Sequence, residues 1–96
     1  MARIIYSGRA LADLERLFKF LDVHDNQAAM ISAERIRQGI GILQNHPLIG
    51  RPVSPGLHEL ILSKDRTGYI ALYYFDKARD IVRILTIRHQ REQPTQ

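Results

Sequence analysis

The apolar residues near the N-terminus recur at helical spacing. They fall at i, i+3, i+4 and i+7, which places them along one side of a helix. Ser7 precedes this segment, and a serine hydroxyl at a helix N-cap accepts a hydrogen bond from a free amide of the first turn. The pattern therefore predicts a first helix. Its apolar side consists of Ala10, Leu11, Leu14, Leu17, Phe18 and Leu21.

A second helix is predicted from a cap at Asp25 or Asn26 to about Asn45. Gly39 and Gly41 lie inside it, and each costs about 1 kcal/mol relative to alanine in a helix interior. We favour close packing as the reason for these glycines, with a pliable end of the helix as the alternative. The two helices form an antiparallel hairpin that can bury its apolar sides together or on a sheet. The apolar side of the second helix consists of Ala29, Ala33, Ile36, Ile40 and Leu43.

The other apolar residues follow β patterns. A short strand is predicted at 2–6, where β-branched and aromatic residues cluster. Three more strands are predicted at 57–63, 69–76 and 80–89, and the short turns between them are typical of an antiparallel meander. The segment 47–56, between the helices and the meander, holds three of the four prolines and is predicted as a loop.

This order of elements predicts an α+β fold with an N-terminal strand, a helical hairpin and then a three-stranded antiparallel meander. The chain has 96 residues, which is enough for one domain, and we assign that domain to residues 1–96. The hydrophobic fraction of 45% and the charged fraction of 25% are close to those of globular proteins. These values exclude a disordered tail and a coiled-coil rod.

Charge and cysteine content narrow the function only slightly. No stretch approaches the roughly 20 apolar residues of a membrane span, so we expect a cytoplasmic protein without membrane association. The 14 basic and 10 acidic residues give a net charge of +4, which permits an anionic partner without requiring one. The absence of cysteine excludes a disulfide framework, a thiolate metal site and a cysteine nucleophile. The four histidines stand far apart, and we expect neither a metal nor a cofactor.

Three tyrosines lie on one predicted strand. Strand alternation places Tyr69 and Tyr73 on one face and Tyr74 on the other. Tyrosines are common in strands, where the ring is buried and the hydroxyl lies at an edge, and we favour this structural role. The alternative is a surface that stacks on a nucleic-acid base or a protein partner.

The end of the last predicted strand carries Arg88, His89 and Arg91. Two arginines around a histidine have the chemistry to bind a phosphate and to move a proton in an RNA-cleaving site. The alternative is a solvated strand end without a specific role. Arg51 and Arg66, in the predicted loop and turn, are candidates to join this cluster.

Five segments together carry a resemblance to a known family. They are 10–15 after the first strand, 43–52, 56–60, 68–74 and 84–91. With these segments in this order, the chain resembles the ParE/RelE superfamily of toxins from bacterial type II toxin–antitoxin modules over nearly its full length. The resemblance implies a helical hairpin packed on a small antiparallel sheet, in agreement with the fold predicted from periodicity.

The resemblance implies one of two targets. RelE-like members are ribosome-dependent ribonucleases that cut messenger RNA with basic residues on the middle strands. They have an arginine directly after the tyrosine that matches Tyr69, where this chain has Ile70, and lysines where it has Ile61 and Ser63. Isoleucine and serine cannot replace these charges, and each lost donor of a phosphate-stabilising site can cost about 10²-fold in rate.

ParE-like members of the superfamily poison DNA gyrase and need no such cations. We therefore favour a ParE-like toxin that inhibits DNA gyrase, blocks replication and is not itself an enzyme. The alternatives are a ribosome-dependent messenger RNA endonuclease and a non-toxic member that only binds its antitoxin. In the endonuclease, His89 and Arg91 are the catalytic candidates. The predicted target-binding residues are Arg51, Arg66, Arg88, His89 and Arg91.

The resemblance also implies a ParD-like antitoxin as a partner. Its C-terminal tail is expected to fold as it wraps the toxin, and operator DNA is expected to be contacted only through the antitoxin. We expect the tail to lie beside the helical hairpin, where apolar residues leave surface uncovered, with burial in the core as the alternative for each of them. The predicted antitoxin contacts are Leu17, Phe18, Leu21, Ile40 and Ile42.

Overall fold

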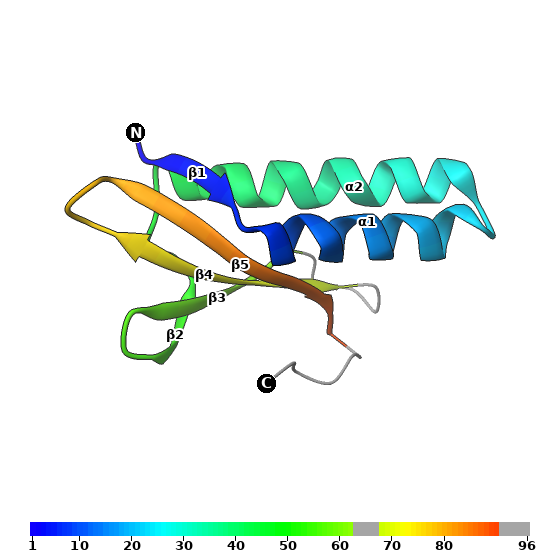
Figure 1. Ribbon diagram of the computed structural model, residues 1–96. Coiled ribbons are helices and arrows are strands. Elements are labelled where there is room, and N and C mark those ends of the chain that lie inside the picture. The colour runs from blue at the N-terminus through cyan, green and yellow to red at the C-terminus, as the bar shows by residue number, and fades with distance from the viewer. Residues whose placement is uncertain (63–67, 91–96) are drawn as a thin grey trace.

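The computed structural model describes residues 1–62 and 68–90 of the chain. Its elements form two layers, in which a helical hairpin lies over one face of a five-stranded sheet (Figure 1). This architecture confirms the predicted α+β fold. The elements are β1 (Arg3–Tyr6), α1 (Gly8–Asp22), α2 (Asn26–Gly41), the 3₁₀ helix η1 (Ile42–Gln44), β2 (Arg51–Ser54), β3 (Leu57–Ile61), β4 (Tyr69–Asp76) and β5 (Ile81–His89).

Both helices begin at the predicted caps. The Ser7 Oγ accepts a hydrogen bond from the amide of Ala10 at 3.0 Å and starts α1. The Asp25 carboxylate accepts one from the amide of Ala28 at 3.1 Å and starts α2, which decides between the two predicted caps. The regular part of α2 ends at Gly41, and η1 then carries the helical path almost to the predicted end. Local side-chain chemistry therefore sets where each helix begins.

The strands are ordered β1-β5-β4-β3-β2 across the sheet. β3, β4 and β5 form the predicted antiparallel meander, and β1 pairs in parallel with β5. The strand predicted at 69–76 has the same bounds as β4, and β5 begins one residue after the predicted 80 and ends at the predicted 89. β3 begins at the predicted residue 57 and ends at Ile61, while the predicted end at 63 lies outside the described residues.

The prediction of a loop at 47–56 is wrong in part, because β2 lies inside this segment. β2 pairs antiparallel with β3 and forms one edge of the sheet. Pro52 has no amide hydrogen to donate, and an edge strand accepts proline where a central strand does not. Gly56 has a φ of 78°, which allows the tight turn from β2 to β3. The prolines that indicated a loop are thus compatible with an edge hairpin.

The hydrophobic core fills the space between the sheet and the hairpin. Gly39 belongs to this packing, because a Cβ there would lie 2.8 Å from the Cδ2 of Leu62. The close-packing interpretation is therefore confirmed for Gly39, whereas a Cβ on Gly41 would meet open space. The helices contribute buried residues to this core, and so does the sheet. They include Ala10, Leu17, Ile36, Ile40 and Leu43 from α1, α2 and η1, and Tyr69, Ala71, Tyr73, Val82, Ile84 and Ile87 from β4 and β5.

The N-terminal part of α1 completes the edge of β5. β1 ends opposite Ile84, and the register of β4 against β5 then shifts, which leaves Leu85 as an extra residue in β5. Ser7 donates from its amide to the carbonyl of Ile84 and from its hydroxyl to that of Leu85, each at 2.9 Å. The carboxylate of Asp13 accepts a hydrogen bond from the amide of Ile87, also at 2.9 Å. Ser7, which caps α1, and Asp13 within α1 thus supply the hydrogen-bond partners of β5 beyond the end of β1.

Asp13 is the residue to test in this contact. It is only 8% exposed, and Arg9 and Arg16 lie 3.8 and 3.6 Å from its carboxylate. We predict that Asp13→Ala lowers the free energy of unfolding by about 2 kcal/mol, because the buried amide of Ile87 loses its acceptor. Urea unfolding followed by circular dichroism measures the change. Glu15→Ala, in the same helix but exposed, is the control and should leave the stability nearly unchanged; an equal loss in both variants would contradict the assignment.

Candidate target-binding surface

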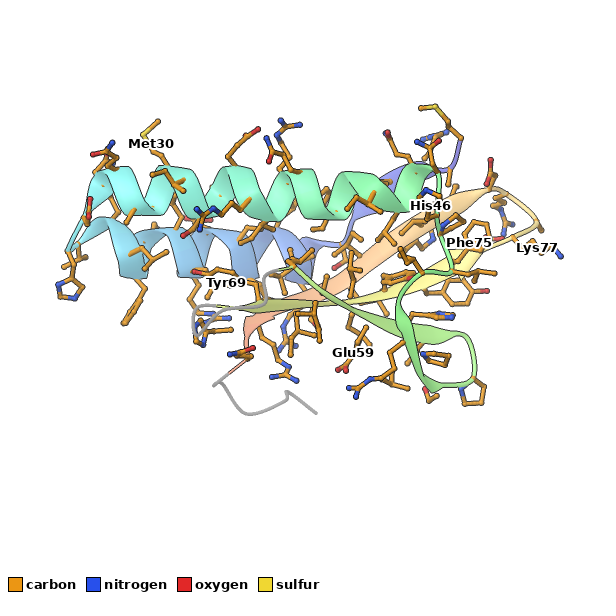
Figure 2. The ribbon with its side chains drawn as sticks, turned by 180° about the vertical axis from the view of Figure 1, so that it is seen from behind. Met30, His46, Glu59, Tyr69, Phe75 and Lys77 are labelled. Carbon is orange, nitrogen blue, oxygen red and sulfur yellow. The ribbon has the colours of Figure 1, made fainter. Side chains whose placement is uncertain are left out.

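The sheet has a second face, which is turned away from the two helices. Strand alternation assigns to it the residues that lie between the core positions. Figure 2 shows Glu59 on this side and Tyr69 between the sheet and the helices. We call this surface the outer face. It consists of Arg51 of β2, Leu57, Glu59 and Ile61 of β3, Ile70, Leu72 and Tyr74 of β4, and Arg83, Thr86 and Arg88 of β5.

Two of the predicted target-binding arginines meet on the outer face, and both contact Glu59. Arg51 lies directly opposite Glu59 across the β2–β3 pair, with 2.6 Å between its Nη2 and the Oε1. The Nη2 of Arg88 lies 3.9 Å from the Oε2 of the same carboxylate. The side chains of Glu59 and Arg88 are 18% and 17% exposed, whereas that of Arg51 is 74% exposed. Glu59 in β3 thus lies between two cations of the same face, one from β2 and one from β5.

Sequence analysis missed Glu59 as part of this cluster. The residue belongs to a segment that carries the family resemblance, but its partners are not close to it in sequence. The pairing with Arg51 requires that β2 is a strand, and Arg88 is reached only across β4. A hairpin turn recognised at Gly56 would have been the signal for the first of these contacts.

His89 points to the opposite side of β5 from Arg88. Its ring packs edge-on against that of Tyr69, with 5.5 Å between the ring centroids and an angle of 90° between the planes. Tyr69 belongs to the core, so His89 lies on the helix side of the sheet. The structure therefore does not bring Arg88 and His89 to one face. Arg66 and Arg91, the remaining predicted target-binding residues, lie outside the described residues.

The tyrosines follow the favoured structural interpretation. Tyr69 and Tyr73 are buried in the core, while Tyr74 is 40% exposed on the outer face. The hydroxyl of Tyr73 accepts a hydrogen bond from the amide of Gly50 at 2.9 Å, and burial raises the pKa of this hydroxyl above its usual range. The ring of His58 stacks on that of Tyr73 at 5.4 Å. Because Gly50 directly precedes Arg51, this bond fixes where β2 begins.

A second surface feature is a groove along the helical hairpin, with a volume of about 490 Å³. Two predicted antitoxin contacts, Leu17 and Phe18, are among the residues that line it. Glu15 and Arg37 also line it and add one charge of each sign. The groove is lined in addition by Tyr6, Leu11, Leu14, Ala29, Ala33 and Ile36.

The predicted antitoxin contacts do not form one surface. Leu17 and Ile40 are 8% and 1% exposed and belong to the core, so the expectation that they leave apolar surface uncovered is wrong. Both side chains pack in the hydrophobic core with buried residues of the sheet. Leu21 is half-buried near the end of α1, and Ile42 is exposed in η1, beyond the far end of α2.

The described part of the chain adds two further observations. It contains no group of three or more histidine and acidic residues placed to hold a metal ion. None of its helices has the length and apolar character needed to cross a membrane.

Comparison with known proteins places this structure in a family. Residues 4–94 match the family described as the ParE toxin of the type II toxin–antitoxin system parDE. The chain belongs to the ParE toxin family. It is also 32% identical over 89 residues to Toxin RelE2 of Caulobacter vibrioides, with 93% of this chain and 96% of that protein covered.

Solved toxin structures share the fold of this ParE-family toxin. A chain of the chromosomal ParDE system from P. aeruginosa superposes with a TM-score of 0.77 at 22% identity, covering 93% of this chain and 96% of that one. A chain of the intact E. coli RelBE toxin–antitoxin complex superposes with a TM-score of 0.69 at 14% identity, covering 97% and 100%. The resemblance to the ParE/RelE superfamily is therefore confirmed, and both branches share the fold.

Gly50 gives a direct test of how the start of β2 is positioned. A Cβ at this residue would lie 2.6 Å from the hydroxyl oxygen of Tyr73 and 2.7 Å from the backbone oxygen of Glu59. We predict that Gly50→Ala lowers the free energy of unfolding by about 2 kcal/mol, because backbone must move to admit the methyl group. Gly41→Ala is the matched control, since its methyl group meets open space, and it should not destabilise the protein. Thermal unfolding of both variants measures the change in stability. If Gly50→Ala were as stable as the unchanged chain, the close packing around Gly50 would be contradicted.

Proposed function

We propose that this toxin inhibits DNA gyrase and blocks replication, and that it does not cleave RNA. One row of residues across the outer face carries the proposal. Ile61 lies opposite Ile70, and Ile70 lies opposite Arg88. The family resemblance assigns a lysine and an arginine to the first two positions in ribonuclease members. Here two neighbouring isoleucines occupy them, on the face that also carries Glu59.

The physics of RNA cleavage supports this choice. A pentacoordinate phosphate needs preorganised cations around it, and each missing donor can cost about 10²-fold in rate. Arg88, the charged member of the row, lies beside the carboxylate of Glu59. His89 packs against Tyr69 on the other side of the strand. Inhibition of gyrase by binding makes no such demand on the outer face.

Ribonuclease activity is the second candidate function. The observation that favours it is the 32% identity to a protein named Toxin RelE2. In this case His89 and Arg91 would be catalytic, and the isoleucines at 61 and 70 would be compensated by cations elsewhere. A toxin-like protein that only binds its antitoxin is the third.

We further propose that a ParD-like antitoxin silences the toxin in the cytoplasm and makes the contact to operator DNA. The groove along the helical hairpin fits an apolar segment of the antitoxin tail, because it is lined by leucine, phenylalanine and alanine side chains. Solved relatives come from ParDE and RelBE systems, one of them as an intact toxin–antitoxin complex. An amphipathic helix in a hydrophobic groove is a common mode of peptide recognition.

The target can be tested by pulse labelling of DNA and protein synthesis directly after induction of the toxin in bacteria without the antitoxin. We predict that DNA synthesis falls first, and that His89→Ala and Arg91→Ala, which each remove one contact of a binding surface, weaken the growth arrest without abolishing it. Purified gyrase should then accumulate cleaved DNA in the presence of the toxin. An early fall in protein synthesis, abolished by either substitution, would establish the ribonuclease instead. Unchanged growth with a soluble, antitoxin-binding chain would favour the third function.

The antitoxin groove can be tested at Ala33, an exposed residue of α2 that lines it. We predict that Ala33→Arg weakens binding of the antitoxin encoded beside the toxin by about tenfold or more, because burial of an unpaired charge is costly. Gln38→Arg adds the same side chain to the same helix outside the groove and is the control. Calorimetric titration of both variants measures the difference. Equal affinities would place the antitoxin on another surface.

A further inference from the structure

Glu59 holds together the two predicted target-binding arginines that the structure describes on the outer face. Its two carboxylate oxygens face different partners, with Oε1 toward Arg51 and Oε2 toward Arg88. The three side chains come from β3, β2 and β5. Their positions relative to one another therefore depend on the pairing of the four strands from β2 to β5. Two positive charges and one negative charge leave a net charge of +1 at this point.

A guanidinium group binds carboxylate and phosphate oxygens with the same geometry. The carboxylate of Glu59 thus occupies the place where a phosphate group would be bound between Arg51 and Arg88. Glu59 is 18% exposed, so its charge is partly shielded from water and acts strongly on both neighbours. A phosphate that approached the arginines would have to displace this carboxylate and would be repelled by it.

The surroundings do not compensate for this repulsion. The nearest positions on the outer face are apolar, with Leu57 and Ile61 on either side of Glu59 in β3 and Leu72 opposite it in β4. Arg83, the other cation of the outer face, lies opposite Tyr74, toward the other end of β5. An anion near Glu59 would therefore gain little from other charges of this face.

We infer that Glu59 is a specificity-determining residue that keeps the phosphodiester backbone of nucleic acids off the outer face. Without it, Arg51 and Arg88 form an anion site suited to a single-stranded nucleic acid. The inference extends the proposed function but does not rest on it, since it concerns the toxin alone and holds whichever target the toxin has.

The test is binding of a short labelled single-stranded RNA to the full chain, followed by fluorescence anisotropy at several salt concentrations. Glu59→Gln removes the charge and keeps the shape of the side chain. We expect it to bind RNA about tenfold more tightly at low salt than the unchanged chain, because the negative charge of Glu59 no longer competes with phosphate for charge-assisted hydrogen bonds from Arg51 and Arg88. The salt dependence should steepen by about 1.4 in the logarithmic slope, at about 0.7 for each phosphate contact on a single strand. DNA of the same sequence should respond alike.

Glu34→Gln is the matched control, because it makes the same change in net charge at an ion pair with Arg37 on α2. A general charge effect would tighten RNA binding equally in both variants and would overturn the inference. Retention of the gain after Arg51→Gln and Arg88→Gln are added to Glu59→Gln would also overturn it. Glu59→Met removes the charge without leaving an unpaired amide and replaces Glu59→Gln if that variant does not fold. Growth arrest by the toxin is not a readout here, so failure of the proposed function would not affect the result.

Discussion

The structure depends on how the edge of β5 is completed after β1 ends. β1 covers this edge only to Ile84, and the amide and carbonyl groups beyond it need other partners. Ser7 and Asp13 supply these partners from the start and the middle of α1. Ser7 also caps α1, so one residue both begins the helix and attaches it to the sheet. The position of the helical hairpin over the sheet follows from these bonds.

The extra residue at Leu85 determines which side chains of β5 point outward. In a regular strand, alternation from Val82 and Ile84 would place Arg88 under the helices and His89 outside. A bulge reverses this order, because one inserted residue exchanges the two faces. Arg88 therefore reaches Glu59 on the outer face, and His89 packs against Tyr69. The bulge lies where α1 takes over the edge, and backbone pairing and side-chain placement are thus set at the same point.

The elements governed by local chemistry were predictable from the sequence. The caps at Ser7 and Asp25 and the spacing of apolar residues determine both helices within a few neighbouring residues. β2 was not predictable in this way, since its prolines are typical of loops and only its pairing with β3 makes it a strand. The spacing of apolar residues also did not show which of them are buried in the core and which line the groove. Leu17 and Phe18 are neighbours on one apolar side, and the sheet beneath the helix decides that Leu17 is the more deeply buried.

The cluster around Glu59 shows why charge counts alone say little about partners. The chain carries a net charge of +4, yet several of its cations lie in ion pairs, including Lys19 with Glu15, Arg37 with Glu34 and Arg79 with Asp76. The first two pairs are exposed and contribute little to stability, but all three reduce the positive potential close to the surface. Whether one surface of the protein attracts phosphate then depends on the few residues of that surface rather than on the net charge of the chain. On the outer face, two isoleucines and one glutamate suffice to change that local balance while the backbone fold of the superfamily is kept.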